Sequence, residues 1–202
     1  MICQGCHSFS GGFLCDRCRA DLRPAAERIL EGGIRLVAAF EHTGVARGLV
    51  HDLKYRGLTR FADLVVDVVA PRVPRLPIVP VPRAWSRQIR YGIDPAREIG
   101  FRLAAALEVP LLDSLTAPIH AIRRAGGDHS RPPPGFRVRE PAEDPVLLVD
   151  DVVTTGATVL SAAKTPGMRR LALVISATVA DMVSSPPTRS GEQMNHRPST
   201  ES

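Results

Sequence analysis

One segment, from Val146 to Thr158, constrains the fold of this 202-residue chain more than any other. It begins with four apolar residues, continues with Asp150 and Asp151, and ends in small hydroxyl residues around a glycine. An apolar run without polar alternation is typical of a strand buried on both faces, as in a parallel α/β sheet. Open α/β sheets bind their ligands at the carboxyl ends of such strands. The segment therefore predicts a strand that ends at Val149 and delivers two carboxylates to a ligand-binding edge.

The polar residues of this segment suit a sugar that carries a phosphate. Carboxylates accept the hydrogen bonds that adjacent ribose hydroxyls donate. Neighbouring strand residues point to opposite faces, so the two acids need not compete for one proton. Threonine hydroxyls, close backbone approach at Gly156 and the N–H groups of a following helix would bind phosphate. An ordinary strand-to-helix turn capped by threonine is the alternative interpretation.

All four cysteines lie in the first 18 residues as two C-x-x-C pairs, Cys3 with Cys6 and Cys15 with Cys18. Each pair can present two thiolates to one ion, which predicts a tetrahedral zinc site. Two disulfides are the alternative. The chain begins without a basic stretch and an apolar core, so we expect no signal peptide and a cytoplasmic location, where disulfides are disfavoured. Four thiolates leave no open coordination position, which predicts a structural role for the zinc.

The segment around Asp150 resembles the phosphoribosyl diphosphate (PRPP) signature of type I phosphoribosyltransferases. Three earlier segments occur in a family-like order: residues 51–57 (HDLKYRG), 79–82 (VPVP) and 91–96 (YGIDPA). Together with the cysteine cluster, they are similar to the ComF family. Members of that family are phosphoribosyltransferase-like and in some bacteria are linked to DNA uptake during competence. The resemblance covers about residues 1–180.

The resemblance implies a role for each matching residue. Asp150 and Asp151 are the expected catalytic residues, in contact with the ribose hydroxyls. Lys54 and Arg83 would meet the diphosphate, although a solvated lysine at a helix end is an equal alternative for Lys54. Mg²⁺ would bridge diphosphate and ribose oxygens. The loop that would hold the 5′-phosphate consists of Thr154, Thr155, Gly156, Ala157 and Thr158.

The formal net charge of the chain is +5, and almost all of its basic residues are arginines. Arginine binds phosphate in a bidentate manner, so a basic surface would suit an anionic ligand or nucleic acid. A genomic preference for arginine codons explains the same composition. No apolar stretch reaches membrane-spanning length, so we expect no membrane insertion. Few aromatic residues occur, and they offer no obvious platform for base stacking. The sequence leaves oligomerisation open.

The alternation of expected strands and helices predicts an α/β protein with a parallel-sheet, type I phosphoribosyltransferase-like core. We expect a zinc knuckle at residues 1–20, this core at 21–180, and a disordered tail at 181–202. Residues 125–145, rich in Gly, Pro and Arg, are expected to form a long loop. Helices are expected at 25–31, 44–55, 61–70, from Pro95 behind an Asp94 cap, and from Thr158 to about Lys164. Further strands are expected at 34–40, 76–81 and 171–179.

Two functions of different classes follow. The first is an enzyme that transfers phosphoribosyl from PRPP to an unidentified acceptor, and the signature segment favours it. The second is a non-enzymatic accessory protein whose zinc knuckle and basic surface bind single-stranded DNA or a partner such as a competence protein. The cysteine cluster, the excess of arginine and the departure of loop 125–145 from the family pattern favour this second function.

Overall fold

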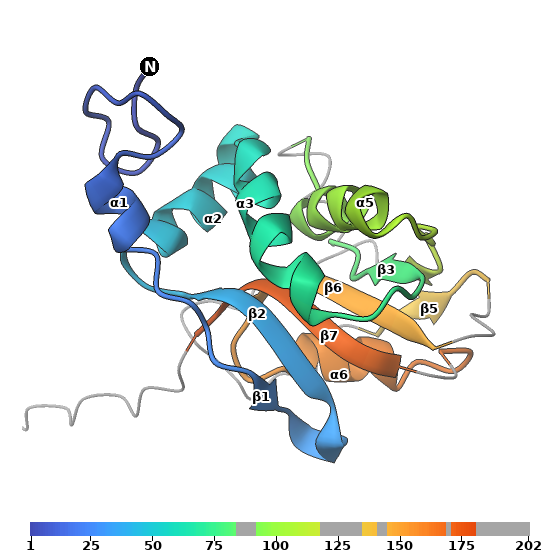
Figure 1. Ribbon diagram of the computed structural model, residues 1–202. Helices are drawn as coiled ribbons and strands as arrows, with labels where there is room; N and C mark the ends of the chain where they lie inside the picture. Colours follow the sequence, from blue (N-terminus) through green and yellow to red (C-terminus); the bar gives the residue numbers. More distant parts are fainter. Residues whose placement is uncertain (84–91, 118–134, 141–144, 169–170, 181–202) are drawn as a thin grey trace, which may run out of the picture.

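A five-stranded sheet in the order β1-β2-β7-β6-β3 forms the centre of this α/β protein (Figure 1). The structure is a computed structural model that describes residues 1–83, 92–117, 135–140, 145–168 and 171–180. Four of the strands are parallel: β2 (Arg35–Glu41), β3 (Ile78–Pro80), β6 (Val146–Val153) and β7 (Leu171–Val179). The predicted α/β class with a mostly parallel sheet is therefore confirmed.

Helices cover both faces of the sheet (Figure 1). One face packs against α2 (Gly44–Arg56), α3 (Arg60–Val69) and α5 (Pro95–Leu107). The other face packs against α6 (Ala157–Ala163) and residues of the short pair β4 (Leu115–Thr116) and β5 (Arg137–Val138). Short 3₁₀ turns, η1 (Glu31–Gly33) and η2 (Ala70–Arg72), complete the described elements of this core. Burial on both faces explains the unbroken apolar runs of β6 and β7.

Helix ends follow their local residues. Asp94 accepts a hydrogen bond from the Arg97 N–H at 3.3 Å, and Pro95 occupies the first turn of α5, as predicted. Helix α2 ends at Gly57, whose φ of 69° is left-handed and suits glycine. Helix α6 ends at Ala163 with Lys164 as its C-cap, close to the predicted end.

Strand β6 extends further than the sequence predicted. Asp150 pairs with Ser176, and Val152 with Thr178, on β7. On its other side, β6 pairs with β3 only as far as Val149, whose carbonyl accepts the Val81 N–H at 2.8 Å. The predicted strand end at Val149 is therefore right on the β3 side and wrong on the β7 side, because β7 supplies ladder partners as far as Val179.

The helix predicted at residues 25–31 is wrong. This segment is extended: the Ala25 N–H donates to the Ala39 carbonyl at 3.1 Å, and β1 (Arg28–Ile29) pairs antiparallel with β2. The outer edge of β2 offers unpaired backbone groups, and the segment satisfies them. That tertiary requirement overrides the local helical propensity.

Parts of two other predictions lie outside the described residues, namely residues 125–134 and 141–144 of the long loop and the tail at 181–202. Within the described part of the expected loop, β5 forms a short strand rather than irregular backbone. No helix in the described part of the chain has the length and apolar character needed to cross a membrane.

Candidate functional site

The four cysteines converge at the amino terminus as their spacing predicted. Their sulfur atoms all lie within 4.8 Å of one another, and Cys6 Sγ is 3.8 Å from Cys15 Sγ. A tetrahedral ion with Zn–S bonds of about 2.3 Å has sulfur–sulfur edges of about 3.8 Å. All four cysteines are free thiols rather than disulfides. The cluster can therefore hold one structural metal ion such as zinc.

Local backbone geometry assembles this cluster. Cys15 is the N-cap residue of the short helix α1 (Asp16–Ala20), so Cys15 and Cys18 lie on one helical turn. The Cys15 N–H donates to Cys3 Sγ at 3.3 Å and joins the two pairs. Backbone N–H groups, above all that of Cys15, lower the pKa of Cys3 to about 6. A lowered thiol pKa favours the thiolate, the form that binds metal.

The knuckle packs on the main core instead of standing apart from it. Cys3, Leu14 and Cys18 are buried in the same apolar cluster as side chains of α2 and α3. A Cβ atom placed on Gly5 would lie 2.9 Å from Cys18 Sγ and 3.1 Å from the Val45 side chain. The absence of a side chain at Gly5 thus lets the first cysteine pair approach both the second pair and α2.

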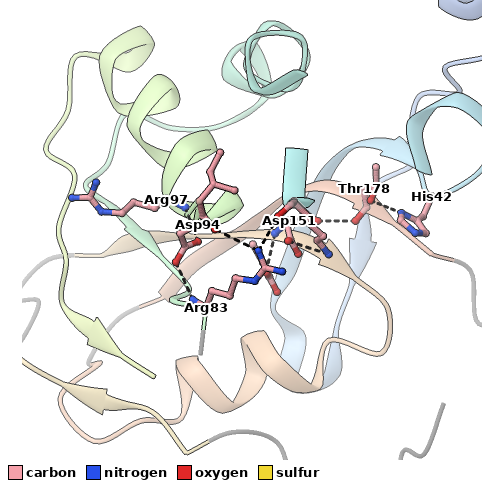
Figure 2. A network of polar contacts seen from close by, with 10 residues as sticks. His42, Arg83, Asp94, Arg97, Asp151 and Thr178 are labelled. Carbon is pink, nitrogen blue, oxygen red and sulfur yellow. Dashed lines mark hydrogen bonds and ion pairs between the residues drawn. The ribbon is translucent and has the colours of Figure 1, made fainter. Parts of the chain in front are cut away.

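A second cluster of polar side chains lies at the carboxyl edge of the parallel strands (Figure 2). The Lys54 ammonium, in the last turn of α2, lies 3.0 Å from Asp151 Oδ2 on β6. The Arg83 N–H, just beyond β3, donates to Asp94 Oδ2 at 2.9 Å. Four elements therefore bring together residues that are distant in the sequence.

The Arg83 side chain is held between α2 and α5. Its Nη1 donates to the Lys54 carbonyl at 3.1 Å and to the Ile93 carbonyl at 3.4 Å. Its guanidinium carbon lies 5.4 Å from the centre of the Tyr55 ring. A cation at the carboxyl end of α2 is favourable because the last carbonyls of a helix carry partial negative charge. Arg83 thereby positions the helix end that carries Lys54.

Burial raises the pKa of two carboxyl groups at this site, Asp150 and Asp94. Burial, followed by the charge of Asp151, raises the pKa of Asp150 to about 8. The Asp151 N–H donates to Asp150 Oδ1 at 2.8 Å and partly opposes this rise. Burial also raises the pKa of Asp94. Although adjacent strand residues point apart, the charge of Asp151 still contributes to the raised pKa of Asp150.

The loop after β6 forms a tight turn into α6. Gly156 is buried with a φ of 79°, and a Cβ there would lie 3.2 Å from Leu30. The Thr155 hydroxyl accepts the Ala157 N–H at 3.3 Å, while Thr154 is exposed and Thr158 is half-buried in α6. The loop lies directly after the acidic residues of β6, so both predicted parts of the site occupy one end of the sheet.

His42 is a residue of this edge that the sequence reasoning missed. Its ring Nδ1 lies 2.8 Å from the buried Thr178 hydroxyl on β7 (Figure 2). Its backbone N–H donates to the Val179 carbonyl. Burial, with the positive charges of Lys54 and Arg47, lowers its pKa. Its position directly after an apolar strand was the available signal, because that strand ends at the same edge as β6.

Comparison with known proteins adds no assignment to these sites. No model of a protein family matches the chain, and no curated protein matches it with significance. What is established is therefore an α/β protein with a mostly parallel sheet and an amino-terminal cluster of four cysteines.

Proposed function

We propose that the protein binds PRPP with Mg²⁺ at the carboxyl edge of the sheet and transfers its phosphoribosyl group to an acceptor. The observation that carries the proposal is the Lys54–Asp151 pair next to Asp150, at the end of a parallel strand that leads directly into the threonine loop. Carboxylates suit ribose hydroxyls, an ammonium suits diphosphate, and a threonine turn suits a terminal phosphate.

In this reaction the bond from ribose C1 to diphosphate breaks, and an oxocarbenium-like centre develops at C1. Asp150 and Asp151 hold the ribose through its hydroxyls, and the threonine loop holds the 5′-phosphate. Lys54 neutralises charge on the departing diphosphate, while Arg83 fixes the helix turn that carries Lys54. Mg²⁺, when bound, shields the diphosphate oxygens. The contribution of the chain is to hold both ends in place and to stabilise the separating charges.

Titration calorimetry with PRPP and Mg²⁺ tests the binding step. We expect the wild type to bind and the double variant Asp150→Asn with Asp151→Asn to lose at least about 100-fold in affinity, or about 2.7 kcal/mol. Asp63→Asn is the matched control, since that exposed carboxylate pairs with Arg102 at a distance from the edge. Equal affinity in the wild type and the double variant rejects the proposed site. Diphosphate release over a panel of acceptor bases and amines tests the transfer.

A second candidate function, binding of single-stranded DNA, is favoured by one exposed aromatic side chain. Phe9 is 93% exposed on the knuckle, and Arg17 and Arg19 of α1 are exposed nearby in the sequence. An exposed aromatic ring can stack on a base, and exposed arginines can contact phosphates. We expect salt-dependent binding that Phe9→Ala weakens by about 1–3 kcal/mol. Phe101→Ala, which removes an exposed ring from α5, should bind as the wild type does.

A further inference from the structure

The cysteine knuckle and the acidic edge contact opposite ends of one helix, α2. The knuckle side meets the first turn of this helix through Gly5, whose absent side chain makes room for Val45. The edge side meets the last turn through Lys54 and its carbonyl. Val45 and Lys54 are separated by an axial rise of about 14 Å along the helix.

The first turn of α2 is capped from outside the helix. Thr43 occupies the N-cap position but makes no side-chain hydrogen bond there. Instead, Asp21 Oδ2 accepts the Val45 N–H at 2.8 Å. Gly44 has a φ of 44°, and a Cβ on it would collide with the same carboxylate. Because Asp21 directly follows α1, which contains Cys18, the start of α2 is attached to the metal-binding segment.

The body of α2 is well suited to transmit a displacement between its ends. Ala46, Leu49, Val50 and Leu53 are buried along one side, in the cluster that also contains Cys3 and Cys18. A close-packed interior has low compressibility, so a displacement at one end of a packed helix is transmitted as strain toward the other end. At the far end, the Lys54 ammonium has Asp151 as its partner, and the Lys54 carbonyl has Arg83.

We propose that metal occupancy of the cysteine knuckle regulates the PRPP site through the position of α2. With the metal bound, Asp21 and Gly5 fix the first turn, and the last turn holds Lys54 beside Asp151. Without the metal, Asp21 is held only from the side of Arg23, whose carbonyl accepts the Glu41 N–H of β2, and it loses its support on the knuckle side. The first turn of α2 then shifts, and Lys54 leaves the edge. The identification of PRPP as the regulated ligand rests on the proposed function. Linkage requires that PRPP with Mg²⁺ strengthen metal binding by the same factor by which metal strengthens PRPP binding.

The two lysines of the chain provide a direct readout that does not depend on PRPP. Lys54 and Lys164 are the only lysines, so ¹³C-lysine labelling gives two side-chain signals in NMR. Lys164 caps α6 on the other face of the sheet, pairs with Glu31 at 3.6 Å, and serves as the internal reference. Asp151→Asn marks the signal of an unpaired Lys54.

We expect zinc removal from the full chain to shift the Lys54 signal toward its position in Asp151→Asn, with Lys164 unchanged. Asp21→Ala with zinc bound should produce part of this shift, and Asp63→Ala should produce none. Asp21→Ala keeps the test valid even if the zinc-free chain unfolds. An unchanged Lys54 signal in both the folded zinc-free protein and the zinc-bound Asp21→Ala variant overturns the proposal.

Zinc affinity, measured by competition with a chromophoric chelator, tests the regulation itself. Saturating PRPP and Mg²⁺ should raise zinc affinity by about 5- to 50-fold in the wild type, and less in Asp21→Ala. If PRPP binds the zinc-loaded protein but leaves its zinc affinity unchanged, the regulation is wrong and the proposed function stands. If the zinc-loaded protein does not bind PRPP, the proposed function fails along with its regulation, and a zinc-dependent Lys54 signal still identifies the mechanical link.

Discussion

The cysteine knuckle takes its four sulfur atoms from residues 3–18, whereas the acidic edge takes its side chains from residues 42 to 178. In the knuckle, each C-x-x-C pair is closed by a local turn or a helix start. At the edge, the carboxyl ends of parallel strands must first align before Lys54 and Asp151 can meet. The first site thus depends on nearby backbone, and the second depends on the completed sheet.

The sharpest difference within the knuckle is between Cys18 and Cys6. Both supply a sulfur to the cluster, but Cys18 is buried in the core with α2 and α3 while Cys6 is exposed. We expect Cys18→Ala to lower the free energy of unfolding by about 5 kcal/mol, through lost metal and lost packing. Cys6→Ala should lose the metal equally but cost about 1–2 kcal/mol less.

Zinc content and denaturant unfolding of the two variants measure this difference. Equal losses of stability in Cys6→Ala and Cys18→Ala would show that packing of the knuckle on the core contributes nothing. Retention of one zinc per chain in either variant would contradict a four-cysteine site.

Replacing Asp150 tests how much the buried acid lowers the free energy of unfolding as pH rises. The pKa of Asp150 rises to about 8 in the fold, above its ordinary value near 4. Its stabilising contribution is therefore complete below about pH 4 and is lost as pH rises to about 8. Asp150→Asn stays uncharged, so it should match the wild type near pH 4 and exceed its stability by about 5 kcal/mol above pH 8.

Guanidinium unfolding at several pH values between 4 and 9 measures this difference. Asp63→Asn removes an exposed carboxylate and should show no comparable gain at high pH. A constant difference between Asp150→Asn and the wild type over this range would contradict the raised pKa.

Alanine substitutions at two glycines should change stability in opposite directions. One glycine lies in the threonine loop and the other inside α2. Gly156 has a φ of 79° and Leu30 against it, so Gly156→Ala should destabilise the protein by about 1–2 kcal/mol. Gly48 lies inside α2 with open space for a Cβ, so Gly48→Ala should stabilise it by about 0.5–1 kcal/mol. Thermal unfolding gives both signs, and a stabilising Gly156→Ala would reject the strained turn.

The elements with long apolar patterns could be predicted from their own residues. The helices α2, α3 and α5 and the strands β2 and β7 form close to the predicted ranges, because helical spacing or continuous apolar character persists over several turns or pairs. The helix prediction for residues 25–31 was wrong for the opposite reason. The conformation of this segment is decided by the open edge of β2, and nothing within the segment encodes that neighbour.

The sequence by itself determined the cysteine cluster, the acid pair and the turn that follows it, because each is a local pattern of a few residues. Only the tertiary structure decided that β6 continues past its acids, that His42 and Asp94 join the edge, and that Arg83 holds the end of α2. It also joined the knuckle to α2 through Asp21. The physical reason is that strand pairing and helix packing bring together distant residues, and burial then sets their charges.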